Sequence, residues 1–109
     1  MNNSPHLVVL VTAGSADEAA AIARALVEER LAACANVVPG IRSIYRWEGA
    51  VHDDAEVLLV VKTRADRFEA LARRVGELHS YDVPEVIALP VVAGSARYLA
   101  WLDEAIAGA

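Results

Sequence analysis

The residues best suited to chemistry lie in one short segment, His79 to Glu85, which reads His-Ser-Tyr-Asp-Val-Pro-Glu. It places an imidazole and the carboxylates of Asp82 and Glu85 close together in the chain. Imidazole nitrogens and carboxylate oxygens both bind divalent metal ions, so this segment is the strongest local candidate for a metal site. An alternative stays open, because a histidine at the C-terminal end of a helix can also bond the last carbonyl groups and interact with the helix dipole.

The single cysteine, Cys34, is a second possible metal contact, since an ionised thiol is a soft ligand. A lone cysteine is also commonly a small buried hydrophobic residue. One cysteine cannot form an internal disulfide, a zinc site made of cysteines alone, or the cage of an iron–sulfur cluster.

His52, Asp54 and Glu56 alternate along one predicted strand, so their side chains share one face. The set has a spacing compatible with metal binding, but we expect Arg42 and Arg46 of the preceding strand to lie opposite it. Cross-strand ion pairs are therefore the favoured interpretation of these charges.

Two features could hold an anion: the pair Lys62 and Arg64, and the backbone amides of the turn at residues 12–15. A solvated strand end and ordinary helix capping by Ser15 are the alternatives. The turn contains neither the two cysteines of a metallochaperone nor the arginine of an acylphosphatase. No nucleophile, base and orienting group stand in a recognisable order, so no catalysis is expected.

The composition predicts a single soluble domain over residues 1–109, with a formal net charge of -5 and 56% hydrophobic residues. The acidic balance provides no broad positive field for nucleic acid. No apolar run approaches the roughly 20 residues of a membrane span. The apolar stretch Leu7 to Val11 is too short for the core of a signal peptide, so we expect a cytoplasmic protein with no membrane partner.

The elements that must position these residues follow from the apolar periodicity. It predicts strands over residues 7–12, 34–47, 51–64 and 86–92, helices over 16–33 and 66–79, and a last helix after Gly94-Ser95. Right-handed crossovers with both helices on one face give an α+β, ferredoxin-like split βαβ fold. The order is β-α-β-β-α-β plus a C-terminal helix, around an antiparallel sheet with a long central hairpin.

The hairpin has consequences for assembly. A strand of about 14 residues spans ~46 Å, whereas a 100-residue domain has a radius of gyration of only ~13 Å, so the hairpin should project beyond the two helices. The projecting half carries Tyr45 and Trp47, and such apolar surface needs a cover, which predicts a homo-oligomer. Alternatively, Pro39-Gly40 bends the hairpin back onto its own core. For the apolar faces to coincide, Ile41, Tyr45 and Trp47 should share a face with Val51 and Val57, across a three-residue loop at 48–50.

Several segments together resemble one known family. They are Leu-Ala-Ala-Cys-Ala-Asn-Val-Val-Pro-Gly at 31–40, Ser-Ile-Tyr-Arg-Trp-Glu-Gly at 43–49, Glu-Val-Leu at 56–58 with Lys-Thr at 62–63, His-Ser-Tyr-Asp-Val-Pro-Glu-Val-Ile at 79–87, and Tyr-Leu-Ala-Trp at 98–101. Nearly the whole chain in this way resembles the CutA divalent-cation tolerance proteins. The resemblance implies a ferredoxin-like homotrimer whose long hairpins pair with neighbouring subunits, and an association with copper and other divalent cations. It also implies an architecture similar to the PII signalling proteins.

The resemblance also implies site residues. It carries over His79, Glu85 and Cys34 as metal contacts, for Cu(II) or another divalent cation, and Tyr45, Trp47, Lys62 and Tyr81 as the lining of an intersubunit cleft. In some family members a cysteine and a histidine are proposed copper ligands, and Val11 and Leu78 occupy those positions here. The expected function is that of a trimeric, cytoplasmic cation tolerance protein with weak metal binding and no catalysis. The alternative is a PII-like trimer that senses a small molecule or anion through Lys62.

Overall fold

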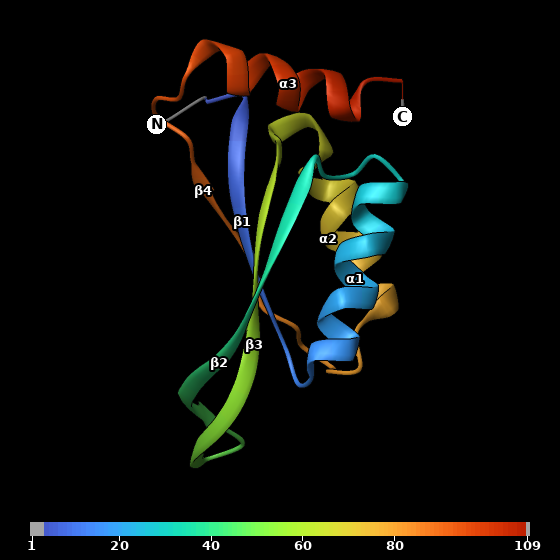
Figure 1. Cartoon of the computed structure of the whole chain (residues 1–109). Helices are drawn as coiled ribbons and strands as arrows, with labels where there is room; N and C mark the ends of the chain where they lie inside the picture. The colour runs from blue at the N-terminus through green and yellow to red at the C-terminus, as the bar shows by residue number, and fades with distance from the viewer. Residues whose placement is uncertain (1–3, 109) are drawn as a thin grey trace.

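The computed structural model describes residues 4–108, so the first three residues and the last residue of the predicted domain lie outside it. In chain order the elements are β1 (His6–Ala13), α1 (Ala16–Glu28), β2 (Cys34–Trp47), β3 (Ala50–Arg64), the 3₁₀ turn η1 (Ala65–Arg67), α2 (Phe68–Leu78), β4 (Val86–Pro90) and α3 (Ala96–Ile106). The strands form one antiparallel sheet of order β2-β3-β1-β4, with α1 and α2 together on one face (Figure 1). The predicted α+β ferredoxin-like fold is confirmed. Within the described residues, no helix is long and apolar enough to cross a membrane.

The core lies between the sheet and these two helices. Alternate residues of the central strands β1 and β3 face the helices, and Val9, Val11, Leu59 and Val61 are fully buried. Apolar side chains of α1 and α2, among them Ile22, Leu26, Leu71 and Val75, complete the cluster. The alternation of apolar side chains that predicted the strands therefore also determines which face of the sheet the helices cover.

Helix α1 is shorter than expected, because it ends at Glu28 and not at residue 33. Arg30 has a φ of 59°, and the amides of Leu31 and Ala32 both donate to the carbonyl of Leu26. These bonds satisfy the free carbonyl at the helix end and turn the chain toward the sheet. The apolar residues after Glu28 belong to this turn, and Ala32 is buried there. Their spacing continues the apolar pattern of the helix, although the residues are not helical.

The predicted interruption of the second strand is confirmed, since the register between β2 and β3 shifts between Val38 and Ile41, around Pro39-Gly40. The predicted pairing beyond it is wrong by one residue. The loop contains two residues, Glu48 and Gly49, whose φ values of 50° and 78° are those of a tight hairpin turn.

This shorter loop exchanges the faces of the projecting hairpin. Tyr45 lies opposite His52 and Trp47 opposite Ala50, so the aromatic side chains share a face with Asp54 and not with Val51. Arg42 pairs with Asp53, at 2.6 Å, instead of with the expected His52–Glu56 face. The side chains of Tyr45 and His52 stack with ring centroids 5.3 Å apart.

The hairpin extends well past the ends of α1 and α2, as predicted, and gives the molecule its length of 44 Å against widths of 30 and 23 Å (Figure 1). At the other end of the sheet, α3 lies across the strands and packs Leu102 and Ile106 against Ala33. Polar contacts hold it there: Asp103 accepts a hydrogen bond from the His6 ring, at 2.9 Å, and pairs with Arg64.

Acid is expected to weaken this attachment of α3. The contacts with His6 and Arg64 lower the pKa of Asp103 below its ordinary value of 3.8. A carboxyl group with a lowered folded-state pKa stabilises the fold above its unfolded pKa, and this stabilisation is lost as the pH falls through the folded value. Thermal unfolding followed by circular dichroism should give a steady midpoint above about pH 4 and a falling one below it. In Asp103→Asn the fall should be smaller, and an acid dependence equal to that of the wild type would contradict this assignment.

Candidate functional site

His79 lies immediately after α2 with its side chain fully buried. Its Nε2 is 2.7 Å from the carbonyl oxygen of Thr12, which can only accept, so Nε2 carries the hydrogen. The backbone N–H of Tyr81 donates to Nδ1 at 3.1 Å. Nε2 therefore joins the segment after α2 to the end of β1, and Nδ1 holds the backbone of Tyr81 within that segment, so neither nitrogen is free to bind a metal in this conformation.

Glu18 of α1 holds the same segment from a second side. Its carboxylate accepts the backbone N–H of Ser80 at 2.8 Å and lies 3.6 Å from Nδ1 of His79. Burial acts to raise the pKa of Glu18, but the hydrogen bonds from Ser80 outweigh it and lower the pKa. The helix capping expected of Ser15 is present, since its hydroxyl accepts the backbone N–H of Glu18 at 3.1 Å. The role of Glu18 in anchoring the segment was not predicted.

Tyr81 is fixed by the contacts just described and by its own hydroxyl. The hydroxyl donates to Oε2 of Glu56 at 2.7 Å, and the ring lies 4.6 Å from that of His79. A Cβ added to Gly14 would come within 3.2 Å of this hydroxyl, so the small residue in the turn after β1 makes room for it. Burial and the bond to Glu56 raise the pKa of Tyr81, which keeps the phenol protonated as a donor.

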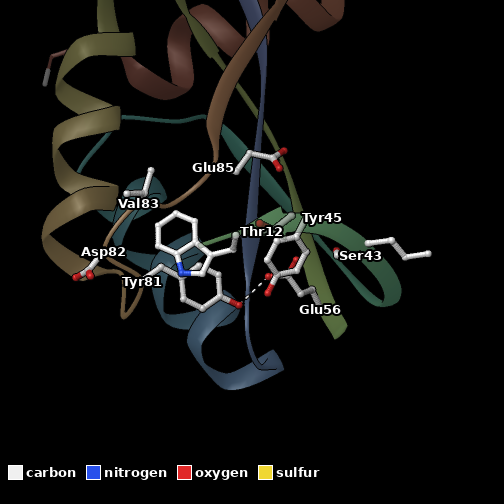
Figure 2. A pocket seen from close by; sticks show the side chains of 10 residues that line it. Thr12, Ser43, Tyr45, Glu56, Tyr81, Asp82, Val83 and Glu85 are labelled. Carbon is white, nitrogen blue, oxygen red and sulfur yellow. Dashed lines mark hydrogen bonds between the residues drawn. The ribbon is translucent and has the colours of Figure 1, made fainter. Parts of the chain in front are cut away.

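Tyr81 and Glu56 line a pocket of about 570 Å³ between the projecting hairpin and the segment after α2 (Figure 2). The lining comes from the end of β1, from β2 and β3 and from that segment: Thr12, Ser43, Ile44, Tyr45, Trp47, Glu56, Tyr81, Asp82, Val83 and Glu85. A volume of this size is typical of sites for small molecules. Tyr45, Trp47, Tyr81, Asp82 and Glu85 were all candidates from the sequence for a metal site or a cleft, and Glu56 was considered as a metal ligand but expected to form a cross-strand ion pair.

The pocket is acidic and aromatic. Its charged lining residues are Glu56, Asp82 and Glu85, and no lysine, arginine or histidine is among the residues that line it. Three aromatic side chains, Tyr45, Trp47 and Tyr81, also line it. The Tyr45 hydroxyl donates to Asp54 at 2.6 Å, and this bond raises the pKa of Tyr45. Such a surface attracts cations and repels anions.

Cys34 and Lys62 lie elsewhere. They pair across β2 and β3 at the level of Val8 in β1, whereas His79 contacts Thr12 near the opposite end of that strand. The Lys62 ammonium donates to the side chain of Asn36. The structure thus brings Glu85 to the pocket with Tyr45, Trp47 and Tyr81, and it separates Cys34 and Lys62 from them within one chain.

Across residues 4–108, no three histidine, cysteine, aspartate or glutamate side chains converge closely enough to hold a metal ion. Val11 is buried in the core, and Leu78 is apolar, so neither offers a ligand. From the sequence, Glu56 was expected to form a cross-strand ion pair and not to line a pocket, because the predicted register placed an arginine opposite it. The observed two-residue loop places Glu56 on the same face of the hairpin as Tyr45. If the sequence had been paired with this shorter loop, the alternation of side chains would have predicted that Glu56 faces the pocket.

The chain is similar to proteins of one family. Residues 7–105 match the family model described as CutA1 divalent ion tolerance protein. The divalent-cation tolerance protein CutA of Thermus thermophilus is 57% identical over 97 residues, which are 89% of this chain and 94% of that protein. Human protein CutA is 49% identical over 94 residues, which are 86% of this chain and 52% of the relative, so the chain spans about half of that protein. The chloroplastic CutA of Arabidopsis thaliana is likewise covered over 54% of its length.

Solved structures agree with these relatives. The Cut A1 structure from Thermus thermophilus superposes with a TM-score of 0.89 at 56% identity, covering 91% of this chain and 96% of the other. The structure of the periplasmic divalent cation tolerance protein CutA from Archaeoglobus fulgidus superposes with a TM-score of 0.90 at 39% identity, covering 93% of this chain and 98% of the other. The match in sequence extends over residues 7–105, and the match in fold over 91% and 93% of the chain. The chain belongs to the CutA1 divalent ion tolerance protein family.

Proposed function

We propose that the chain acts in divalent-cation tolerance as a homotrimer that binds divalent cations weakly, without a catalytic step. The observation that carries the proposal is the pocket between the hairpin and the segment after α2, which is lined by three carboxylates and no basic residue. Carboxylate oxygens bind hard divalent cations, and an excess of them concentrates cations near the surface.

Association with further copies is supported by the apolar surface that one chain leaves uncovered. Large apolar side chains are exposed on the hairpin, on β4 and on α3: Ile44, Tyr45, Trp47, Val51, Ile87, Leu89, Tyr98 and Trp101. Single exposed apolar residues are ordinary, but a projecting hairpin with four of them is marginal unless another surface covers it. The two edge strands, β2 and β4, also offer unpaired backbone groups to neighbouring copies.

Weak rather than tight metal binding follows from the placement of the candidate ligands. Glu85 lines the pocket together with Glu56 and Asp82, but among the described residues these carboxylates do not converge into a three-ligand set. His79 uses both ring nitrogens to hold the segment in place, so we assign it a positioning role. Cys34 is a free thiol at a separate place on the sheet, where it could contact copper as a soft ligand.

The alternative, a PII-like trimer that senses an anion, has less support. An anion site needs a basic side chain or free backbone amides in the cleft. The pocket has only acidic charges, and Lys62 contacts Asn36 at a distance from it within one chain. The cation-binding function is therefore the one that we retain.

We also propose a cytoplasmic location, because a free, partly exposed cysteine such as Cys34 is stable in a reducing compartment. Among similar proteins, the CutA of Arabidopsis thaliana is named as chloroplastic and that of Archaeoglobus fulgidus as periplasmic. Fractionation of cells that carry the full gene, with antibodies to this chain, tests the proposal, and recovery outside the cytoplasm would contradict it.

Calorimetric titration with Zn(II) and Cu(II) tests the metal assignment. Glu85→Gln should weaken Zn(II) binding several-fold, whereas Glu28→Gln, which makes the same change on the exposed end of α1, should leave it unchanged. Cys34→Ser should reduce Cu binding under reducing conditions and leave Zn(II) binding in the pocket intact. Equal affinities for Zn(II) in the wild type and Glu85→Gln would contradict the role of the pocket.

A further inference from the structure

We infer that two arginine side chains, Arg30 and Arg67, form a clasp that holds the C-terminal end of α3 against the rest of the subunit, and that the strained backbone of Arg30 is retained for this contact. Both bonds of the clasp lie within one chain, so they do not depend on what neighbouring copies cover. The inference is also independent of the proposed cation binding, because neither arginine lines the pocket.

The clasp joins distant parts of the chain. Nη1 of Arg30, in the turn after α1, donates to the carbonyl oxygen of Ala107 at 2.8 Å. Nη2 of Arg67, in η1, donates to the carbonyl oxygen of Ile106 at 3.0 Å. The last carbonyl groups of a helix have no partner within the helix and carry the negative end of its dipole. The two guanidinium groups therefore satisfy two neighbouring acceptors at the end of α3 where positive charge is most favourable.

Neither arginine of the clasp is paired with an acidic residue. Within residues 4–108, Arg42, Arg64 and Arg74 form ion pairs with carboxylates, whereas Arg30 and Arg67 form none. The hydrogen-bond partners of these two guanidinium groups are the carbonyl groups at the end of α3. Their placement is therefore not a by-product of ion pairing on the surface.

Both arginines are held in an unfavourable state. The φ of Arg30 is 59°, a left-handed value that is usual for glycine at the end of a helix and unfavourable for a residue with a Cβ. The Nε of Arg67 is buried and has no hydrogen-bond partner among the described residues, which is also unfavourable. Residues persist in such states where the surrounding structure holds them. Here both residues bond the same helix end, and this contact supplies the reason.

The clasp acts on a part of α3 that the main core does not reach. Leu102 and Ile106 pack in a small cluster that is separate from the core between the sheet and the other helices. Tyr98 and Trp101, which a neighbouring copy would cover, lie in the N-terminal half of α3. Loss of the clasp should therefore loosen the last turn of α3 whether or not the first turns are covered.

Hydrogen exchange of the assembled protein, followed by mass spectrometry of its peptides, tests the inference with Arg30→Gly. Glycine removes the side chain and the backbone strain together, so this variant should fold. We expect the amides of residues 103–107 to exchange at least about fivefold faster than in the wild type, because a charge-assisted hydrogen bond is lost. The amides of residues 27–33, at the end of α1, should exchange no faster, because glycine suits the left-handed turn.

Three further variants complete the test. Arg67→Gln should accelerate exchange at residues 103–107 as Arg30→Gly does, and Arg30→Lys, which keeps a donor and a charge, should give intermediate rates. Arg24→Ala changes an exposed arginine of α1 that makes neither of these bonds, and it should leave both segments unchanged. Unchanged exchange at residues 103–107 in Arg30→Gly would overturn the inference. So would an equal increase in Arg24→Ala, an acceleration spread evenly over the chain, or faster exchange at the end of α1 in Arg30→Gly.

Discussion

A His79→Ala substitution should lower the free energy of unfolding by about 3–5 kcal/mol, because it opens a cavity and leaves two partly buried backbone groups without these partners. The side chain is fully buried, and its ring nitrogens bond the carbonyl of Thr12 and the N–H of Tyr81. The loss of these bonds should also release Tyr81 from its place against Glu56. A loss of cation binding in this variant would then follow from a disordered pocket wall.

Chemical denaturation of the wild type and two controls separates this role from that of a ligand. His79→Gln can both donate and accept, so it should recover part of the lost stability. His52→Ala removes an imidazole from the exposed hairpin and should change the unfolding midpoint little, since its contacts are a ring stack on Tyr45 and a long bond to Trp47. If His79→Ala unfolds at the wild-type midpoint and loses only metal binding, His79 is a ligand and the positioning role is wrong.

The second large effect is expected at the tip of the molecule, where Ile44→Lys should dissociate the trimer. Ile44 is 65% exposed in one chain and lies opposite Asp53, so a lysine is compatible with the fold of a single subunit. In the proposed trimer the side chain is covered by a neighbour, and burial of an ammonium group there costs about 3 kcal/mol or more at each contact. Light scattering coupled to size exclusion should therefore report the mass of one subunit.

Val27→Lys is the matched control for this change. Val27 is also an exposed apolar residue, at 40%, but it lies near the end of α1, away from the hairpin. A lysine near a helix C-terminus interacts favourably with the helix dipole, so this variant should remain trimeric. A trimer that persists in Ile44→Lys, or dissociates equally in both variants, would show that the hairpin does not make the contact.

The sequence was sufficient for the fold, because its apolar residues recur with the period of each element. Val9 and Val11 alternate with half-exposed neighbours, and Ser15 with Glu18 marks the start of α1. It was not sufficient for the end of α1. There a left-handed Arg30 turns the chain while the apolar pattern continues, so periodicity alone placed the end five residues too late.

The pocket could be predicted only in part, and the reason is register. A turn of two residues and one of three are both compatible with the hairpin sequence, and the choice decides whether Tyr45 shares a face with Glu56 or with Val57. The contacts of His79 could not be inferred either, since they join residues 67 positions apart in the chain. Motif spacing identified the residues of the segment after α2, but it could not show that the ring nitrogens of His79 are already used in hydrogen bonds within the protein.

Native mass spectrometry of the wild-type protein, titrated with Zn(II) and then with Cu(II), tests the central claim most directly, because each spectrum reports subunits and bound ions together. The account predicts a complex of three 11.6 kDa chains whose ions appear only at high metal concentration and are readily lost. A monomer at micromolar concentration, or a trimer that takes no ion beyond the number bound by Glu85→Gln, would contradict it.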